Sequence, residues 1–565
     1  MKQTSLRAGW TALVLVLACA GVALGATDIH SVGSAASEVD VTFENGSPRI
    51  LLVTDYYTYG ASPFPNEPAS KLWVDPNGFD ENVVPYLYVV NRVTMAERFL
   101  TLDTATGNLV SRNTETPLFG VAGDPILAPT PDLSGGVDLF GPGSIFGSIP
   151  GLDTSTGHYA LVFELRNEAG RVISRDNAMY SYIDAVVPRE GTLPGSETWT
   201  SNNAYLITDQ VFVGAGDTLT IQPGTVVFGD GTAPVAASVG VLQGGSINAN
   251  CSEFLPCRFT SALERSQRQT QDFGGLIVNG FAPTNQGLNP PPQGEGFTGP
   301  YGGNNPADSS GIMRYLVVEY AGQRFNAEDE LNCIALQGVG TGTVFENIQC
   351  SGGSDDGIEW FGGTVGGTNL MADSNEDDQF DWTFGWNGTV TNLCALHRVS
   401  PPGGSDDANQ CIEADNDNPD NEAEPRSNPT ITNFTCIKGP GSSAPNGEGL
   451  RLRRGTSVQL ANAVVANVSV NDDATSAVWI DGASSVNQLT TGAMTLDVVV
   501  DGVPAGAVSD PVGAAGVMTG NSFLADGAHP LQPQLAPRNG ARGCTTRTGD
   551  WTTGFWLNWD VGQGN

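Results

Sequence analysis

The sequence predicts an all-β protein in which a smaller β domain precedes a right-handed parallel β-helix (β-solenoid). Glycine is abundant, at 72 of 565 residues, only 15% of the residues are charged, and no long helical pattern is present. Short apolar runs alternate with tight turns, and one asparagine motif recurs along the chain. Because 39% of the residues are hydrophobic, the chain can fill a core, so the glycines indicate turns rather than disorder.

Residues 1–25 have the pattern of a secretory signal peptide. Lys2 and Arg7 form a basic start, a short apolar run follows, and the small residues of "ALGA" offer a cleavage site. A lipoprotein-type signal ending at Cys19 is the alternative, although it would shorten the apolar run. The run is too short to span a bilayer. We therefore expect an exported protein, secreted or at the cell surface, and not an integral membrane protein.

Residues 26–190 are expected to form the N-terminal β domain. Strand-like runs such as "RILLVTDYYTYG" and "YLYVVNRVT" are separated by recurrent turn signals. The segment "YALVFELRNEAGRVISRD" has the pattern of a hairpin that turns at "NEAG". A sandwich-like arrangement is one form that such a domain takes.

Residues 191–565 are expected to form the β-helix. An asparagine followed by an apolar residue recurs at intervals of 22 and 23 residues, and then at 41 and 29, which implies insertions. A short period with one set of strands per repeat is typical of a solenoid, whose coils bury apolar side chains only by stacking. Asparagines repeated at one turn suit a ladder in which amides hydrogen-bond from coil to coil. The pairs are Asn347-Ile348, Asn369-Leu370, Asn392-Leu393, Asn433-Phe434 and Asn462-Ala463.

The charge balance restricts the partners of the protein. The formal net charge is −36 at pH 7. Nucleic acids and anionic membranes are bound by basic patches, so neither is an expected partner. The acidity favours cations instead.

The cysteines predict disulfides. Eight remain after the signal region, an even number that predicts four disulfides in an exported chain. Cys251 and Cys257 could close a small loop, and the other pairings are left open. Zinc is the competing interpretation, but there is no Cys-x-x-Cys pair and the four histidines are scattered. The eight are Cys251, Cys257, Cys333, Cys350, Cys394, Cys411, Cys436 and Cys544.

Five segments carry a family resemblance: "GDTLTIQPGTVVFGDG", "FGGLIVNGFAPTN", "SDDGIEWFGGTV", "DDQFDWTFGW" and "DWTTGFWLNWD". Together they resemble a group of exported bacterial parallel β-helix proteins whose architecture is similar to the pectate-lyase type of solenoid. The resemblance covers about Leu193–Asn565. It implies the fold and export but no reaction, because the group has no settled activity. The acidic loop at residues 401–426 departs from the compact repeat.

The chain ends in an aromatic cluster of Trp551, Phe555, Trp556 and Trp559. Such a cluster could cap the open end of the solenoid, which would otherwise expose core and strand edges. A platform that stacks carbohydrate is the alternative interpretation.

Aligning the coils by their apolar pairs stacks charged residues outside. Alternate side chains of a strand face opposite ways, so a residue between two inward apolar residues points outward. Carboxylates stacked about 4.8 Å apart repel by roughly 3 kcal/mol per pair at an effective dielectric of about 20. The apolar pairs are Ile334/Leu336, Ile358/Trp360, Phe380/Trp382, Ile412/Ala414 and Leu450/Leu452. The outward column is Ala335, Glu359, Asp381, Glu413 and Arg451; the preceding turns supply Asn332, Asp356, Asp378, Gln410 and Glu448, and a third column includes Asp355 and Asp377.

Bound calcium is the first explanation of the stacked acids, because Asp, Glu and Asn oxygens suit this ion. "DSNEDD" matches the opening Asp-x-Asn-x-Asp of an EF-hand loop but then departs, with Asp378 in place of Gly and Phe384 in place of the bidentate Glu. The loop Ser405–Glu424 is a second candidate, although solvation explains such loops as well. The predicted calcium ligands are Asp355, Asp356, Asp373, Asn375, Asp377 and Asp378.

Catalysis is the second explanation. Carboxylates about 5 Å apart suit a retaining glycosidase, and wider pairs suit inversion. Glu359, Asp381 and Glu413 would be the catalytic set, with Arg451 beside them to bind an anionic sugar; a lyase would use Ca²⁺ and an arginine base. The third explanation is a solvated wall of acids, with Arg451 and Arg453 as counter-charges.

The predicted function is a calcium-stabilised extracellular or cell-surface protein that binds carbohydrate or another surface. The alternative is a polysaccharide-active hydrolase or lyase that uses the acid column. No Gly-x-Ser-x-Gly, His-Glu-x-x-His, phosphate-binding or dinucleotide motif supports another chemistry. The ligand, the oligomeric state and the role of the N-terminal domain are left open.

Overall fold

The computed structural model divides into two compact units, one up to Val186 and one from Val187 onward. The predicted signal peptide, residues 401–409 of the acidic loop, Glu448 and the C-terminal aromatic cluster lie outside the described residues. The structure describes residues 49–53, 57–60, 70–75, 83–103, 108–118, 137–140, 158–167, 170, 172–183, 185–232, 237–263, 268–324, 330–397, 410–438, 449–466, 478–501, 525–526 and 544.

The first unit contains two β-sheets. Its strands are β1 (Arg49–Val53), β2 (Tyr57–Gly60), β3 (Ser70–Asp75), β4 (Val83–Asn91), β5 (Glu97–Asp103), β6 (Asn108–Arg112), β7 (Val137–Phe140), β8 (His158–Asn167) and β9 (Val172–Ile183). Six strands form one sheet in the order β2-β9-β8-β4-β5-β6, and three form another in the order β1-β3-β7. The antiparallel pairing of β8 and β9 confirms the hairpin predicted at "NEAG".

The second unit is a parallel β-helix, as predicted. Its first strands are β10 (Ala185–Thr192), β11 (Glu197–Trp199), β12 (Asn203–Val213), β13 (Thr218–Ile221), β14 (Val226–Gly229), β15 (Ser238–Val241), β16 (Ser246–Asn250), β17 (Cys257–Ser261), β18 (Gly275–Asn279), β19 (Gln293–Gly294), β20 (Gly299–Pro300), β21 (Gly311–Glu319) and β22 (Ile334–Gln337). The later strands are β23 (Val344–Ser351), β24 (Ile358–Phe361), β25 (Gly367–Asp373), β26 (Phe380–Thr383), β27 (Thr389–His397), β28 (Ile412–Ala414), β29 (Thr430–Lys438), β30 (Leu450–Leu452), β31 (Gln459–Ala466), β32 (Val478–Ile480), β33 (Thr495–Asp501) and β34 (Ala525–Asp526).

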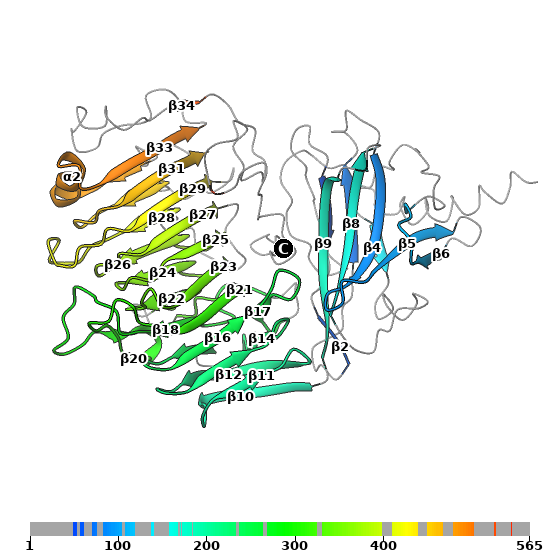
Figure 1. Cartoon of the computed structure of the whole chain (residues 1–565), viewed down its shortest axis with the longest axis horizontal. Coiled ribbons are helices and arrows are strands. Elements are labelled where there is room, and N and C mark those ends of the chain that lie inside the picture. Colours follow the sequence, from blue (N-terminus) through cyan, green and yellow to red (C-terminus); the bar gives the residue numbers. More distant parts are fainter. Residues whose placement is uncertain are drawn as a thin grey trace, which may run out of the picture. The chain divides into compact units, whose positions relative to one another are not determined.

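Three parallel sheets surround one core. Sheet 1 stacks β15, β18, β22, β24, β26, β28, β30 and β32. The longer strands bend: the first half of β21 pairs with β16 in sheet 2, and its second half pairs with β17 in sheet 3. The strands β23, β25, β27, β29 and β31 continue both of these sheets, and they rise as a ladder in Figure 1. The inward side chains of all three sheets form a single hydrophobic cluster.

The bend between sheets 2 and 3 carries the predicted asparagine ladder. Its members are Asn347, Asn369, Asn392, Asn433 and Asn462, whose φ angles lie between 54° and 64°. Asparagine tolerates this left-handed conformation better than most residues. From Asn369 onward, each side-chain amide donates to the amide oxygen of the preceding asparagine, over distances between 2.7 and 3.3 Å. The predicted ladder is therefore confirmed, and it joins five coils at one corner.

Sheet 1 has the predicted register. Ile334 pairs with Ile358, and Ile358 pairs with Phe380. All ten side chains of the predicted apolar pairs belong to the buried core. Burying one such large apolar side chain contributes on the order of 2 kcal/mol. The ring centroids of Trp360 and Trp386 lie 4.3 Å apart, so aromatic stacking adds to this burial.

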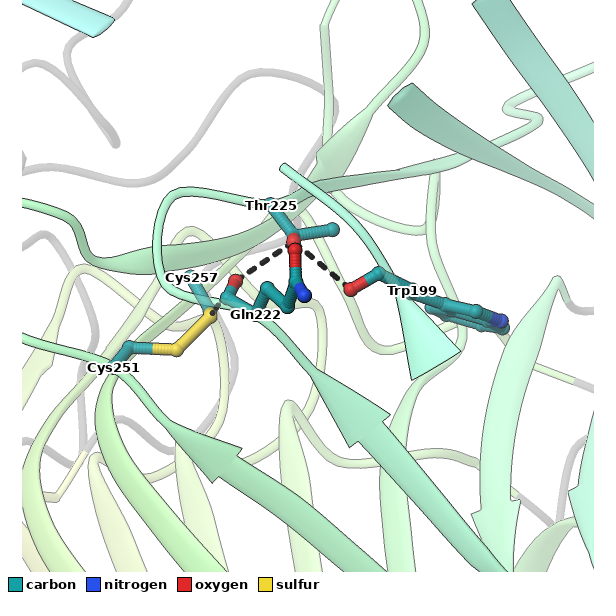
Figure 2. Close-up of a disulfide and its surroundings, with 5 residues drawn as sticks. All are labelled: Trp199, Gln222, Thr225, Cys251 and Cys257. Carbon is teal, nitrogen blue, oxygen red and sulfur yellow. Dashed lines mark hydrogen bonds between the residues drawn. A yellow bond between two sulfur atoms is a disulfide. The ribbon is translucent and has the colours of Figure 1, made fainter. Parts of the chain in front are cut away.

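Three disulfides are present in the described residues, where four were predicted. They join Cys251 to Cys257, Cys394 to Cys544, and Cys411 to Cys436. The first closes the small loop expected from the sequence (Figure 2). Beside it, Thr225 Oγ1 donates a hydrogen bond to the carbonyl oxygen of Gln222 at 2.7 Å. The second disulfide attaches the distant residue 544 to β27.

The fourth predicted disulfide is wrong, because Cys333 and Cys350 are free. Both side chains are buried in the core of the β-helix. Burial raises the pKa of the Cys350 thiol, and a contact with Cys333 raises it further. A buried free cysteine packs as a small apolar side chain. The even number of cysteines therefore did not imply that all of them pair.

An insertion between β18 and β21 crosses the turns of sheet 1, and we call residues 281–305 the insertion loop. Gly363 N donates a hydrogen bond to the carbonyl oxygen of Pro283 at 2.8 Å. Asn285 N donates to the carbonyl oxygen of Phe384 at 3.0 Å. The loop is thus tied to the turns that follow β24 and β26. It includes the β19–β20 hairpin and a single 3-10 turn, η2 (Glu295–Phe297).

The insertion loop covers the first outward side chains of sheet 1. Tyr301 of the loop forms a buried cluster with Ile277 and Ala335, which point outward from β18 and β22. These outward residues are apolar because the loop shields them from water. The acidic residues begin on the next coil, with Glu359.

The structure contains one short α-helix among the elements described, α2 (Gly482–Thr490), which has nine residues. No helix in the described part of the chain has the length and apolar character needed to cross a membrane.

Asn392→Ala should lower the free energy of unfolding by about 2–4 kcal/mol. The change removes the hydrogen bonds to Asn369 and from Asn433, each worth about 1 kcal/mol, and it places alanine at a φ of 63°. Asn392→Gly is the matched control, because it removes the same bonds while tolerating the backbone conformation. Urea denaturation followed by circular dichroism measures both variants. An alanine variant as stable as the wild type would contradict this role of the ladder.

Candidate functional site

The outward side chains of sheet 1 form one row across consecutive coils. The row contains Ala335, Glu359, Asp381, Glu413, Arg451 and Trp479, each of which pairs in register with the next. We call these six residues the outer row. The predicted alignment of the first five is confirmed. Trp479 was missed, because no asparagine repeat marks its coil.

The turn before each strand of sheet 1 carries a second ladder. Oδ1 of Asn332 accepts a hydrogen bond from Asp356 N at 3.2 Å, and Oδ1 of Asp356 accepts one from Asp378 N at 2.9 Å. Oδ1 of Asp378 accepts in turn from Gln410 N at 2.5 Å. Each side chain thus satisfies a backbone N–H in the next coil. These aspartates have a structural role, and the second oxygen of each carboxylate lies outside the ladder.

Two of the six predicted calcium ligands have other partners. Asp373, the last residue of β25, and Asn375, in the turn that follows, are both fully buried. Asp373 Oδ1 accepts a hydrogen bond from Ser374 Oγ at 2.9 Å. Asn375 Oδ1 accepts one from Gly353 N at 2.8 Å, and its Nδ2 donates to Gln379 Oε1 at 3.0 Å. The spacing that resembles an EF-hand loop therefore serves hydrogen bonds inside the turn.

Carboxylates from the turns and the outer row meet in three overlapping groups. In each group, one oxygen per residue lies within 4.8 Å of the others. The first group is Asp355, Asp356 and Asp377; the second is Asp356, Glu359 and Asp381; the third is Asp378, Asp381 and Glu413. We call these seven residues the acid patch. The sequence suggested separate metal-binding and catalytic sets, whereas the structure brings their carboxylates together.

The acid patch is largely shielded from solvent. The exposed fraction is 9% for Glu359, 8% for Glu413, 5% for Asp356 and 2% for Asp378. At these four carboxylates the exposure is too low for the screening by water and salt that a solvated wall requires, whereas the predicted counter-charges Arg451 and Arg453 do pair with Glu413. Repulsion between like charges is stronger in such a shielded place than at the surface.

Burial raises the pKa of most carboxyl groups in the acid patch. Repulsion adds to this effect: Glu295 raises the pKa of Glu359, and Glu359 raises that of Asp381. Burial also raises the pKa of Glu413, but only to about 7, because the charges of Arg453 and Arg451 oppose it. The patch therefore resists full ionisation unless a cation binds. The groups whose pKa rises well above its ordinary value are Asp355, Asp356, Glu359, Asp378 and Asp381.

Arginines balance the acids at one end of the outer row. Arg451 Nη1 lies 3.1 Å from Glu413 Oε1, and Arg453 also forms an ion pair with Glu413. Arg453 Nε lies 2.8 Å from Asp415 Oδ1, and Arg454 Nη1 lies 2.6 Å from Oδ2 of the same residue. Asp415 was missed by the sequence-based prediction because it follows the end of β28. Asp415 follows the outward Glu413 by two residues, and this spacing could have identified it as a second outward acid.

The insertion loop contributes an acid at the other end. Asn332 Nδ2 donates hydrogen bonds to Glu359 Oε2 at 2.7 Å and to Glu295 Oε2 at 3.1 Å. One neutral amide therefore lies between two carboxylates. Burial raises the pKa of the nearby Tyr301 hydroxyl, and Glu295 and Glu359 raise it further. Glu295 was missed because the repeat pattern does not extend to insertions.

The carboxylates in the middle of the acid patch have fewer partners that offset their negative charge than the carboxylates at its ends. Asp356, Glu359 and Asp381 form no ion pair with an arginine or lysine among the described residues. Asp381 Oδ1 is also buried and accepts no hydrogen bond within the described part of the chain. A buried acceptor without a partner is destabilising by about 1–3 kcal/mol, and more when it is charged. The site has the donor set of a hard cation that prefers oxygen ligands.

The comparison with known families supports the resemblance expected from the sequence. The family model described as a pectate-lyase like β-helix domain matches residues 191–556, which is well over half of the chain. No curated protein and no solved structure matches the chain. The expected architecture is therefore confirmed.

In EDTA, the melting temperature of the wild type relative to that of Glu413→Gln should fall as the pH rises from about 4.5 to about 7. Glu413 has a raised pKa in the folded state, so its contribution to stability is present below the unfolded pKa and is lost as the pH rises through the folded pKa. Thermal melts of both proteins across this interval measure the difference. If the difference stays constant or grows with pH, desolvation does not dominate the titration of Glu413.

Proposed function

Because the chain belongs to the pectate-lyase-like β-helix family, we propose that it is an extracellular protein that binds Ca²⁺ in the acid patch and carbohydrate on the same face. The observation that carries this proposal is the group of Asp356, Glu359 and Asp381. Its oxygens lie within 4.8 Å of one another, and its acids have no arginine partner among the described residues. A bound cation would relieve their repulsion.

The position of the arginines indicates which of the three groups in the acid patch would bind Ca²⁺. Glu413 already has two arginine partners, so the third group needs a cation least. The second group has no such partner, and Asp381 Oδ1 is the buried acceptor described above. Calcium binds six to eight oxygens in flexible geometry, whereas magnesium requires a near-octahedral shell. We therefore place Ca²⁺ among Asp356, Glu359 and Asp381 rather than among the turn aspartates alone.

The extracellular location rests on two features. Three disulfides join described residues, and such bonds persist in oxidising compartments. The N-terminal sequence has the pattern of a secretory signal. Carbohydrate is proposed as the ligand because the flat, repeating faces of a solenoid suit extended chains.

The second candidate function is a polysaccharide-active hydrolase or lyase. Two observations favour it: carboxylate oxygens of Glu359 and Asp381 lie within 4.8 Å, and burial raises the pKa of both groups. A retaining glycosidase uses two carboxyl groups about 5–5.5 Å apart, one of which must be protonated. Arg451 and Arg453 beside Glu413 could bind an anionic substrate.

The melting temperature of the wild type should rise on titration with Ca²⁺ after removal of metals by EDTA. A ligand that binds only the folded state stabilises it, and 100 Kd of free ligand adds about 2.7 kcal/mol. Asp381→Asn should abolish this rise, whereas Asp209→Asn, an exposed acid of the same β-helix, should retain it. Differential scanning fluorimetry at fixed ionic strength measures the effect, with Mg²⁺ as the competing ion. A response that Mg²⁺ reproduces, or none at all, would refute the calcium site.

Glu359→Gln separates binding from catalysis. The substitution keeps the shape of the side chain and removes its proton transfer. A binding protein should keep its affinity for carbohydrate within about tenfold, whereas an enzyme should lose about 10²–10⁴-fold in rate. Product release from soluble polysaccharides, measured by reducing ends and by absorbance of unsaturated uronates, distinguishes the two. Turnover by the wild type that Glu359→Gln abolishes would make the enzyme the correct assignment.

A further inference from the structure

We propose that the C-terminal segment, residues 545–565, packs over the outward face of sheet 3, where the disulfide between Cys394 and Cys544 fastens it. The aromatic cluster of this segment would then be buried against the side of the β-helix. It would neither cap the open end of the solenoid nor stack carbohydrate, the two roles that the sequence suggested. The inference concerns sheet 3 and does not depend on calcium or carbohydrate binding in the acid patch.

Outward side chains of sheet 3 are shielded from solvent as completely as those of the core. Val317, Gln349 and Met371 occupy the same outward position in three successive coils, because Val317 pairs with Gln349 and Gln349 pairs with Met371. The exposed fraction of each is 0%. Two of the three side chains are apolar, and burying such side chains stabilises the folded chain. This face of sheet 3 therefore has a cover, just as the inner face has the core.

The outward positions of sheet 2 differ from those of sheet 3. Arg314 and Glu346 pair in register on the outer side of sheet 2 and form a salt bridge of 2.9 Å, with 32% and 41% of their side chains exposed. Thr368, which pairs with Glu346 in the next coil, is exposed as well. Polar side chains at these positions suit water, whereas the apolar side chains of sheet 3 suit a cover.

Cys544 shows which part of the chain reaches this face. It belongs to one buried cluster with Val317 and Met371, and all other members of the cluster among the described residues lie on β21, β25, β27 and β29. Cys394, which points outward from β27, binds it through the disulfide. The backbone N–H of Cys544 also donates a hydrogen bond to Oγ1 of Thr435 on β29 at 2.9 Å. The chain thus lies on sheet 3 immediately before the segment that carries the aromatic residues.

Burial also indicates the direction in which the segment runs. Val464 occupies the outward position of β31, one coil beyond Thr435 toward the C-terminal end of the β-helix, and it is partly exposed. Val317 and Met371, on coils in the other direction, are fully buried. We therefore place the segment from Cys544 toward β21, over sheet 3, rather than toward the last coil.

The length and the composition of the segment fit this face. Three coil steps separate Cys394 from Val317, which is about 14 Å at about 4.8 Å per step. Extended chain spans about 3.4 Å per residue, so Trp551, seven residues after Cys544, can reach across this distance. Aromatic side chains provide large apolar areas, and methionine sulfur packs favourably against aromatic rings. The aromatic residues of the segment are Trp551, Phe555, Trp556 and Trp559.

Oxidation of methionines by hydrogen peroxide tests the proposal, since a thioether is converted to its sulfoxide fastest where the reagent reaches it. A chain that ends at Thr545 keeps both cysteines of the disulfide and lacks the segment. Met371 should oxidise about tenfold faster in this chain than in the full chain, because its face is uncovered. Met95, which is 43% exposed, is the positive control, and Met313, fully buried in the core, should stay protected in both proteins. Peptide mass spectrometry measures each site.

Met494 distinguishes this proposal from a cap on the open end. It is buried directly before β33, in the last coils of the β-helix. Faster oxidation of Met494, and not of Met371, in the shortened chain would show that the segment caps the end, and it would overturn the proposal. No change at either methionine would also overturn it, because the segment would then cover neither place.

Photo-methionine cross-linking of the full chain decides the case in which the shortened chain does not fold, which faster oxidation of Met313 would reveal. Photo-methionine replaces methionine with little change in shape; on illumination its diazirine loses N₂, and the carbene inserts into a neighbouring bond. Met371 should cross-link to a peptide within residues 545–565. Cross-links of Met371 to other parts of the chain alone, or of Met494 to this segment, would overturn the proposal.

Discussion

The asparagine ladder at the bend between sheets 2 and 3 is the constraint on which the rest of the β-helix depends. One amide per coil bonds to the next over 2.7–3.3 Å, at a backbone conformation that few other residues accept. A slip of one residue would reverse the facing of every side chain in a strand. The ladder therefore keeps the apolar side chains of successive coils inside, and with them it keeps Glu359, Asp381 and Glu413 in one outward line.

The same register stacks carboxylates that repel one another, and other groups of the chain offset this repulsion only in part. Backbone N–H groups of the next coil bind one oxygen of Asp356 and one of Asp378. Arginines compensate Glu413, and a neutral amide separates Glu359 from Glu295. The repulsion that remains is concentrated on the group around Asp381. Protons relieve it, and the proposed cation would compete with them for the same oxygens, so the proposed affinity for calcium should decrease toward acid pH.

The features that follow from the sequence repeat were predicted correctly, and the features that lie in insertions or depend on individual residues were missed. Periodicity was sufficient for the parallel β-helix, the register of sheet 1 and the outward row through Arg451. The approach of Glu295 to Glu359 could not be read from it, because Glu295 belongs to an insertion that has no period. Asp373 and Asn375 matched a calcium-loop spacing, yet at a solenoid turn they satisfy neighbouring polar groups. The even number of cysteines also led to a wrong prediction, because Cys333 and Cys350 are free and pack in the core instead of forming a disulfide.

The insertion loop explains why a repeating fold can carry a local site. The outward positions of sheet 1 have the same geometry in every coil. They differ in their side chains and in the segments that cover them. Under the loop they are apolar, as at Ile277 and Ala335. At its edge they become acidic and shielded, and farther along they become Arg451 and Trp479. Along the outer row the side chains therefore change from apolar to acidic and then to basic and aromatic, and the insertion loop covers the apolar end of this order.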